Sequence, residues 1–314
     1  MPIEIEPQCL RIGKYTDHQR VLAMDPSLRL QPQLEVIDKY NSILSLPILP
    51  LSEDDHFKRQ AAVLQASLLD REFDWCAAPV FLLLSDHKGN DEEWYYQLFS
   101  TLCKVIPALT THTECYLFPY GCSAMLLAWR HLEYLLCEKR HPYIWVLAVD
   151  SDPRLSSGVV GQPQQHHIQL NSGIAAESVL LVKIRLSEIG LTRNWFASET
   201  RDREITEANI ESLFRCYSTE HSKGIQQFYA PNTGSAELVE KWTTAYYLLH
   251  PFVGSRTQIV MTGVTTGELG ACSGLYNLLH LYRRYECGEY LHSTLQLEIS
   301  ESQYLGAASY TWHQ

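Results

Sequence analysis

The sequence predicts a layered α/β protein built from two related halves, and two observations lead to this fold class. Strand-like segments alternate with helix-like segments along most of the 314 residues, a pattern typical of helices packed on sheets. A strand–turn–helix unit also occurs twice, around residues 114–138 and around residues 258–285. A repeated unit of this size indicates two halves packed about a pseudo-two-fold axis. We expect one unit, 1–314, whose halves are residues 1–170 and 171–314.

The first repeated unit contains the most informative cysteine. Its strand, Glu114–Phe118, enters a turn at Pro119–Cys122, and an apolar helix is expected over Ser123–Glu138. The next strand, Tyr143–Val149, is a continuous apolar run, which predicts cover on both faces. A cysteine between a strand and a helix N-terminus lies near positive backbone dipoles, which lower the pKa of a thiol. Cys122 is therefore a candidate nucleophile, and the alternative is a small buried hydrophobic residue at a tight turn.

The second unit repeats this order. Gln258–Thr262 is predicted to be a strand, Gly263–Gly267 a turn and about Glu268–Tyr285 a helix, and the glycine-rich loop Gly263–Gly270 spans the turn and the helix start. Glu268 would lie in the first helical turn, where the dipole favours a carboxylate, so a capping role or a role as a substitute base is open to it. Residues 1–75 are the least informative part of the chain. The pattern also predicts strands at Pro79–Leu84, Tyr290–Ile299 and Tyr304–Thr311, and helices at His56–Leu69, Trp94–Val105, Thr206–Cys216 and Ala236–Leu249.

Charge and composition exclude several classes of function. The chain has 25 Lys and Arg against 36 Asp and Glu, and this formal charge of −11 argues against nucleic acid or an anionic membrane surface as a partner. No apolar run reaches the ~18 residues needed to span a bilayer. The acidic start, Met1–Glu6, lacks the basic and apolar regions of a signal peptide. The nine cysteines form no Cys-x-x-Cys pair, which predicts reduced thiols in a cytoplasmic protein.

Motifs for cofactors and metals are also absent from the sequence. It contains no P-loop, no dinucleotide fingerprint and no Gly-x-Ser-x-Gly elbow. The pair His166–His167 has no carboxylate or cysteine at ligand spacing, so a solvated loop is a better interpretation than a metal site. Asp150–Asp152 follows a buried strand and indicates a strand-end turn more than a cation site. We expect no cofactor and no metal.

Four short segments resemble motifs of the thiolase superfamily, in particular of β-ketoacyl synthases, and they occur in the family's order. Cys122–Trp129 resembles the segment that carries the nucleophilic cysteine. Gly173–Ala176 resembles the glycine-rich entry to a core strand, and Ala230–Ser235 resembles the Ala-His-Gly-Thr-Gly-Thr stretch. Met261–Gly270 resembles the Gly-His loop. The resemblance implies a thiolase-like fold with the layer order α-β-α-β-α.

The departures from the family pattern bear on the chemistry. Where condensing enzymes carry two active-site histidines, this sequence has Pro231 and Val264. Neither side chain can donate, accept or move a proton, and losing one oxyanion donor can cost roughly a hundred- to a thousand-fold in rate. The resemblance therefore implies a thiolase-like protein without condensing activity. The alternative is an acyl-thioester transferase or condensing enzyme in which Cys122 works with other groups.

A further resemblance implies a binding function. Short, divergent thiolase-like proteins accompany some bacterial type VI secretion clusters, where they look like loading or chaperone factors for toxic effectors. This chain is similar to them in its length, in the turn Gly121–Ala128 and in Val149–Ser151. It would then be a cytoplasmic adaptor that binds a secretion effector or a related adaptor.

A homodimer is the other expected protein-bound state. Thiolase-like proteins pair through central strands, for which Tyr143–Val149 is the candidate here. Adjacent aromatic residues at Trp94–Tyr96 and Tyr246–Tyr247 are candidate anchors, because interfaces are enriched in tyrosine and tryptophan. Internal packing is the alternative for these aromatic residues.

Overall fold

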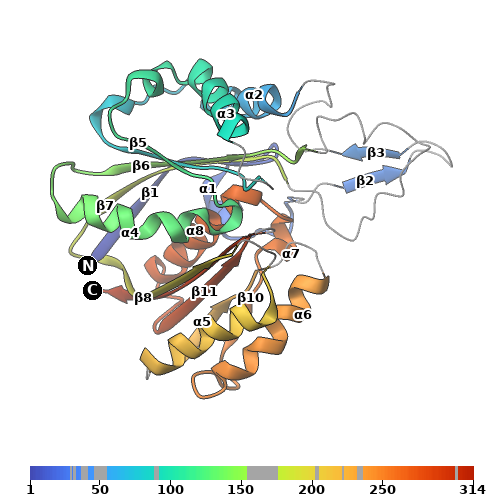
Figure 1. Ribbon diagram of the computed structural model, residues 1–314, viewed down its shortest axis with the longest axis vertical. Coiled ribbons are helices and arrows are strands. Elements are labelled where there is room, and N and C mark those ends of the chain that lie inside the picture. The colour runs from blue at the N-terminus through green and yellow to red at the C-terminus, as the bar shows by residue number, and fades with distance from the viewer. Residues whose placement is uncertain are drawn as a thin grey trace.

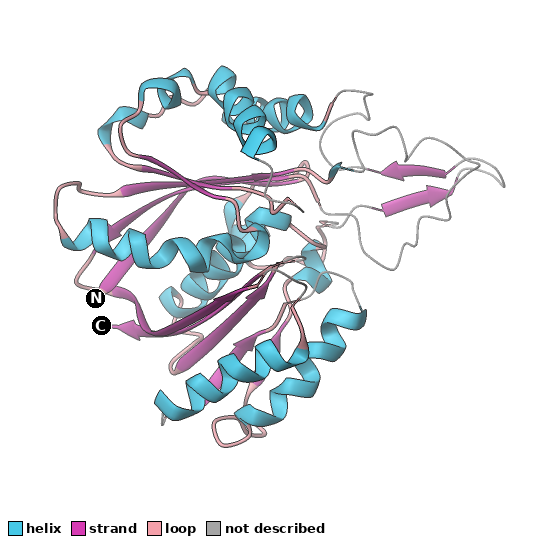
Figure 2. Cartoon of the chain, in the orientation of Figure 1, coloured by secondary structure: helices cyan, strands magenta, loops and turns pink. Residues whose placement is uncertain are grey.

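Two β-sheet halves with a pair of helices between them organise the chain in the computed structural model (Figure 1). Two further helix pairs cover the outer faces, so the predicted order of five layers, α-β-α-β-α, is confirmed (Figure 2). The described helices include none long and apolar enough to cross a membrane. The structure describes residues 1–28, 30, 33–36, 42–45, 55–87, 92–153, 176–201, 205–220, 223–231, 236–300 and 303–314.

The first half of the sheet has the strand order β1-β7-β6-β4-β5. Strands β4, β5 and β6 are parallel, whereas β7 is antiparallel to both β6 and β1. Every residue of β6 is buried, as the apolar run in the sequence predicted. The bounds of these strands are β1 Pro2–Ile12, β4 Val80–Leu83, β5 Cys115–Phe118, β6 Ile144–Asp150 and β7 Ser178–Leu186.

The second half repeats this arrangement in the order β8-β12-β11-β9-β10. Here β9, β10 and β11 are parallel, and β12 is antiparallel to β11 and to β8. The halves join where Pro2 and Ile3 of β1 pair with Thr192 and Leu191 of β8. The bounds are β8 Gly190–Thr200, β9 Ile225–Tyr229, β10 Gln258–Val260, β11 Ser293–Ile299 and β12 Tyr304–His313, and a separate hairpin contains β2 Gln33–Val36 and β3 Ser42–Ser45.

Along the sequence, the chain passes from the first half of the sheet to the second between β7 and β8, because β7 pairs with β6 and β1. A domain boundary at residues 170 and 171 stays a prediction. The parallel strands of each half are linked by helices that lie on the two faces of the sheet, which is how parallel strands are usually connected.

The central helices are α4, Ala124–Cys137, and α8, Ser273–Glu286, and they contact each other between the two sheets. The first agrees with the predicted helix. The second begins five residues later than predicted, because Gly267 (φ 72°) and Gly270 (φ 50°) adopt left-handed backbone conformations that a helix cannot contain. Glu268 lies outside α8, so its expected place in the first turn of the helix is wrong. The intervening segment forms α7, Gly263–Thr266, and the short 3₁₀ turn η7, Gly270–Cys272.

Three apolar clusters hold the layers together. The largest lies around α4 and α8 between the sheets, a second lies beneath α2 and α3, and the third lies beneath α5 and α6. The remaining helices are α1 His18–Leu22, α2 His56–Leu68, α3 Glu92–Val105, α5 Glu207–Glu220 and α6 Ala236–Ala245, and the remaining 3₁₀ turns are η1 Trp75–Ala77, η2 Pro107–Thr111, η3 Gly121–Ser123 and η6 Tyr246–Leu249.

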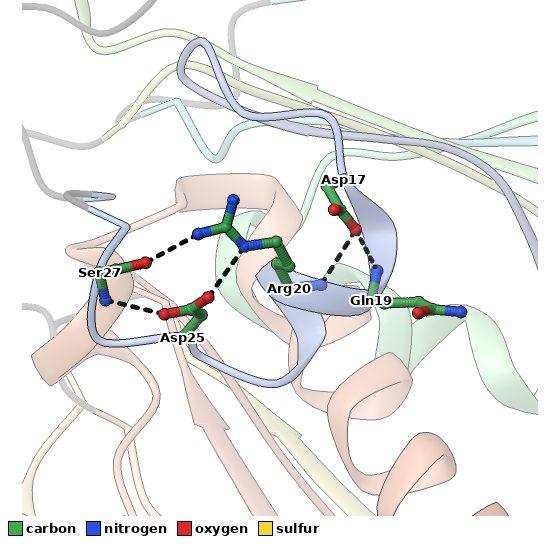
Figure 3. A network of polar contacts seen from close by, with 5 residues as sticks. All are labelled: Asp17, Gln19, Arg20, Asp25 and Ser27. Carbon is green, nitrogen blue, oxygen red and sulfur yellow. Dashed lines mark hydrogen bonds and ion pairs between the residues drawn. The ribbon is translucent and has the colours of Figure 1, made fainter.

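A local polar network holds the short helix α1 and the turn that follows it (Figure 3). Asp17 caps the helix by accepting the Gln19 and Arg20 N–H groups at 3.1 and 3.2 Å. Arg20 in turn binds Asp25 at 2.9 Å and Ser27 at 2.7 Å. The network closes the turn that follows α1. The Tyr276 hydroxyl of α8 donates a hydrogen bond to the Val21 carbonyl of α1 at 2.8 Å, which joins α1 to the central layer.

Candidate functional site

Cys122 lies in the turn η3, between strand β5 and helix α4, and its residue is 6% exposed. The turn depends on Gly121, which has φ 54°. A Cβ atom there would lie 3.0 Å from Asp86 Cβ and 3.2 Å from Ser300 Oγ. Gly270 (φ 50°) occupies the equivalent position in the second half, as the first residue of η7. Ala271 is thus the counterpart of Cys122, whereas the sequence predicts residues 263–267 as the counterpart of the Cys122 turn.

The end of strand β11 anchors the Cys122 turn. The Ser123 N–H donates to Ser300 Oγ at 3.3 Å. The Ser123 hydroxyl lies 3.1 Å from the carbonyl oxygens of Glu298 and Tyr304, and the Ser300 hydroxyl donates to the Tyr120 carbonyl. The turn of the first half is therefore held by a strand of the second half.

The end of strand β6 anchors the η7 turn in the same way. Asp150 accepts the Ala271 N–H at 2.5 Å and the Ser85 hydroxyl at 3.0 Å. A Cβ atom on Gly270 would lie 1.6 Å from Asp150 Oδ2. Burial raises the pKa of Asp150 to about 6, against the lowering effect of these hydrogen bonds. Asp150 is thus a strand-end residue, as the sequence indicated, with an added role in joining the two halves.

A small cavity of about 20 Å³ lies beside Cys122, enough for about one water molecule. Pro231 lines it, whereas Val264 is 56% exposed and is not among its lining residues. None of the described lining residues is a histidine, lysine or arginine. The polar or reactive side chains around the cavity are those of Cys122, Thr262, Thr266, Ser273, Asn277 and Glu298.

Glu298 is the buried carboxyl group of this cavity, with its residue only 2% exposed. Its Oε1 accepts hydrogen bonds from Asn277 Nδ2 at 2.6 Å and from Gln296 Nε2 at 2.8 Å. The Thr262 hydroxyl orients Asn277 by donating to its Oδ1 at 2.6 Å. Burial raises the pKa of Glu298 to about 7, and the two amide hydrogen bonds oppose this shift.

The pKa of the Cys122 thiol is raised well above its ordinary value. Burial is the main cause, and the carboxyl groups of Glu268, Glu298 and Asp150 add to it, while the Ser273 hydroxyl opposes them. The backbone dipoles expected to lower this pKa are thus outweighed by desolvation and acidic neighbours. The role of Cys122 as a nucleophile stays a prediction.

Cys122 also borders a larger cleft of about 530 Å³. Trp94 of α3 lines this cleft and stacks with His87, at 4.7 Å between ring centroids, and with His56, at 6.0 Å. Burial lowers the pKa of His56 to about 4, so its imidazole is neutral at pH 7. Asp86, Asp150 and Asp152 also line the cleft.

Sequence reasoning missed the two histidines of this cleft. His56 begins α2, and His87 lies in the loop after β4. The polar loop after the buried strand β4 could have indicated His87, because parallel sheets bind their ligands beyond the carboxyl ends of the strands.

No three His, Cys, Asp or Glu side chains gather as possible metal ligands within the part of the chain that the structure describes. His166–His167 lies outside the described residues.

Each predicted group of adjacent aromatic residues contains both partly buried and exposed side chains. Trp94 belongs to the stacked group in the cleft, whereas Tyr96 is 68% exposed. Tyr246 packs against Phe228 at 5.3 Å between ring centroids, whereas Tyr247 is 54% exposed. One member of each pair is therefore available to a partner.

The expected dimer strand Tyr143–Val149 is wrong. Its strand, β6, pairs with β4 on one side and with β7 on the other, so its backbone has no free edge. The terminal strand of this half is β5, which pairs only with β4 among the described strands.

These features define the class of the protein as a thiolase-like fold with a cysteine in the turn before its first central helix. The chain is similar to the ketosynthase from module 1 of the bacillaene synthase from Bacillus amyloliquefaciens FZB42, with a TM-score of 0.61 and 10% identity over 98% of this chain and 74% of that chain. It is also similar to the ishigamide ketosynthase/chain length factor, with a TM-score of 0.65 and 12% identity over 100% of both chains.

A third similar structure is that of Xanthomonas campestris OleA with bound lauric acid and lauroyl-CoA, with a TM-score of 0.53 and 9% identity over 99% of both chains. No family model matches the sequence, and no curated protein matches it. The comparisons establish the thiolase-like ketosynthase fold. Activity has to be argued from the site.

Proposed function

We propose that this protein is a non-condensing thiolase-like protein that acts by binding another protein. The make-up of the cavity beside Cys122 carries the proposal. One family histidine position holds Pro231, which lines the cavity, and the other holds Val264, which is largely exposed. The described lining residues offer no imidazole to stabilise an enolate or an oxyanion.

We propose more specifically that the protein is an adaptor that binds a type VI secretion effector. The resemblance of the Gly121–Ala128 turn to short thiolase-like proteins of secretion clusters supports it. Tyr96 is 68% exposed and Tyr247 is 54% exposed. Exposed aromatic side chains of this kind are suitable anchors for a protein partner. The net charge of −11 favours a partner with a basic surface.

We predict that the purified protein releases no carbon dioxide from malonyl thioesters above the rate of the thioester alone. Pro231→His and Val264→His, each made alone, should not restore activity, because the two histidines act as a unit. The measurement is carbon dioxide release with Cys122→Ala as the matched control. A rate that is present in the natural protein and lost in Cys122→Ala would contradict the proposal.

A second candidate function is acyl transfer through Cys122. It is favoured by one observation, that Cys122 also borders the cleft of about 530 Å³ that contains His56 and His87. Incubation with acyl thioesters followed by mass spectrometry of the Cys122 peptide separates the two functions. A stable acyl adduct on Cys122 supports the transferase, and its absence supports the binding protein.

We also predict a dimer in the absence of other partners, formed through the edge of strand β5 that no described strand pairs with. Leu117 on this edge is 39% exposed, and Tyr134 of the adjacent helix α4 is 56% exposed. An unpaired edge strand is a template for a second strand. Leu117→Asp should weaken the dimer at least about tenfold, since it places a charge in the buried interface. Leu291→Asp is the control, because Leu291 is 70% exposed and precedes β11.

Multi-angle light scattering over a range of concentrations measures this dimer. A natural protein that stays monomeric at all concentrations would contradict the β5 interface. Co-purification with the products of neighbouring genes then tests the adaptor function separately, because an adaptor can act as a monomer.

A further inference from the structure

The cleft of about 530 Å³ beside Cys122 has the size of a ligand-binding site, for which volumes of about 300–1,000 Å³ are usual. Its walls come from segments that are far apart in the sequence: the starts of α2 and α3, the loop after β4, the end of β6 and the segment that enters η7. The cleft therefore lies at the carboxyl ends of the strands, a position that binds ligands in α/β folds.

Carboxyl groups dominate the charge of this cleft. Four of them line it, whereas the described lining residues include no lysine and no arginine. The four are Asp86, Asp150, Asp152 and Glu268. Asp152 is only 5% exposed, so water screens its carboxyl group poorly. A cleft lined by one sign of charge concentrates ions of the opposite sign, which predicts a cationic ligand.

An aromatic wall forms another part of the cleft. Trp94 is partly buried and stacks with His87 and His56, and Phe57 packs edge-on against it at 5.4 Å between ring centroids. Because the imidazole of His56 is neutral at pH 7, with its pKa lowered to about 4 by burial, it adds no positive charge to this wall. Aromatic rings attract cations, and a planar guanidinium can also stack on them.

Three ring nitrogens of this wall have no hydrogen-bond partner among the described residues. They are both nitrogens of His56 and Nδ1 of His87, and all three are buried. Nearly all buried polar groups of folded proteins are hydrogen-bonded, so unpaired atoms in the wall of a cleft indicate a missing partner. A neutral imidazole contains one acceptor nitrogen, and a guanidinium has five N–H donors for such acceptors and for carboxylates.

We propose that this cleft binds an arginine side chain of a basic protein partner. The carboxyl groups accept the N–H groups of the guanidinium, and the aromatic wall stacks on its plane. A lysine ammonium fits less well, because it is a compact and strongly hydrated charge that cannot stack. The inference rests on the proposed binding function, for which it names the place and the chemistry of the contact.

The test is isothermal titration calorimetry with the amides of Nα-acetyl-arginine, Nα-acetyl-lysine and Nα-acetyl-citrulline. Citrulline keeps the shape of arginine without its charge, so the arginine amide should bind at least about tenfold more tightly than the citrulline amide. The lysine amide should lie between them. Equal affinities for the arginine and citrulline amides, or no heat of binding with the arginine amide, would overturn the proposal.

Variants of the chain locate the binding. Asp86→Asn keeps the size of the side chain and removes one charge from the cleft, so it should weaken binding of the arginine amide at least about fivefold. Glu237→Gln removes one charge from the surface of α6 and is the matched control. Glu268→Gln, from the opposite wall, replaces Asp86→Asn if that variant does not fold. A folded variant of this pair that binds as tightly as Glu237→Gln contradicts the site.

The cleft and the adaptor function fail in different ways. If the arginine amide binds and Asp86→Asn weakens it, but no product of a neighbouring gene co-purifies, the adaptor function fails and the cation site stands. If a partner co-purifies and Asp86→Asn and Glu268→Gln leave its affinity unchanged, the cleft is not its binding site and the adaptor function stands.

Discussion

Replacing Gly270 with alanine is expected to lower the free energy of unfolding by at least about 3 kcal/mol. The residue has φ 50°, which costs about 1–2 kcal/mol for a side chain with a Cβ atom. That Cβ atom would also lie 1.6 Å from Asp150 Oδ2. Moving Asp150 would break its bond to the Ala271 N–H, which is worth about 1.5–3 kcal/mol for a charged group. Urea unfolding followed by circular dichroism measures the effect.

Two other glycines separate the causes of this loss. Gly288 has φ 73° and no atom within 4 Å of an added Cβ, so Gly288→Ala reports the backbone cost alone. Gly254→Ala also meets no atom within 4 Å and should be nearly neutral. If Gly270→Ala costs no more than Gly288→Ala, the contact between Asp150 and the η7 turn does not carry the predicted energy. A double-mutant cycle with Asp150→Ala tests the coupling directly.

The stability of Glu298→Gln relative to the natural protein should increase with pH by about 3 kcal/mol between pH 4.5 and pH 8. The folded-state pKa of Glu298 is about 7, raised by burial from the value of 4.5 expected in the unfolded chain. The folded state therefore binds more protons than the unfolded state in this interval, and the stability that Glu298 contributes at low pH is lost as pH rises through 7. Each unit of pKa difference corresponds to about 1.4 kcal/mol.

Other buried groups contribute to the pH dependence of both proteins. Asp150, with its pKa raised to about 6 by burial, acts in the same direction as Glu298. His280 and His56, with pKa values lowered to about 3 and about 4 by burial, act in the opposite direction below pH 6.5. The difference between the two proteins isolates Glu298. Urea unfolding at pH 5, 6, 7 and 8 measures it, and a difference independent of pH would show that Glu298 is not a buried, titrating carboxyl group.

Elements with a strong local pattern could be predicted from the sequence. The continuous apolar run of β6 and the amphipathic spacing of α2 are visible without any partner, because their burial follows from their own residues. The long strands β1 and β8 were missed. β1 contains Pro2, Pro7 and acidic residues that disfavour a strand locally, and it is held by its pairing with β7 and β8.

The start of the second central helix shows where local pattern was misleading. Glu268 and Leu269 are good helix formers, but Gly267 and Gly270 on either side of them adopt positive φ, and a Cβ atom at Gly270 would collide with Asp150. The strand-end carboxylate that imposes this turn lies more than a hundred residues earlier in the chain. A prediction from neighbouring residues alone cannot include the contact with Asp150 that fixes this turn.

The sequence by itself determined the fold class and the strand–turn–helix segment that holds Cys122. These are properties of short segments and their order. Only the tertiary structure decided the environment of Cys122, because it buried the thiol and brought the carboxyl groups of Glu268, Glu298 and Asp150 towards it. The ionisation of a group depends on its desolvation and on the charges around it, and both arise only when distant segments pack together.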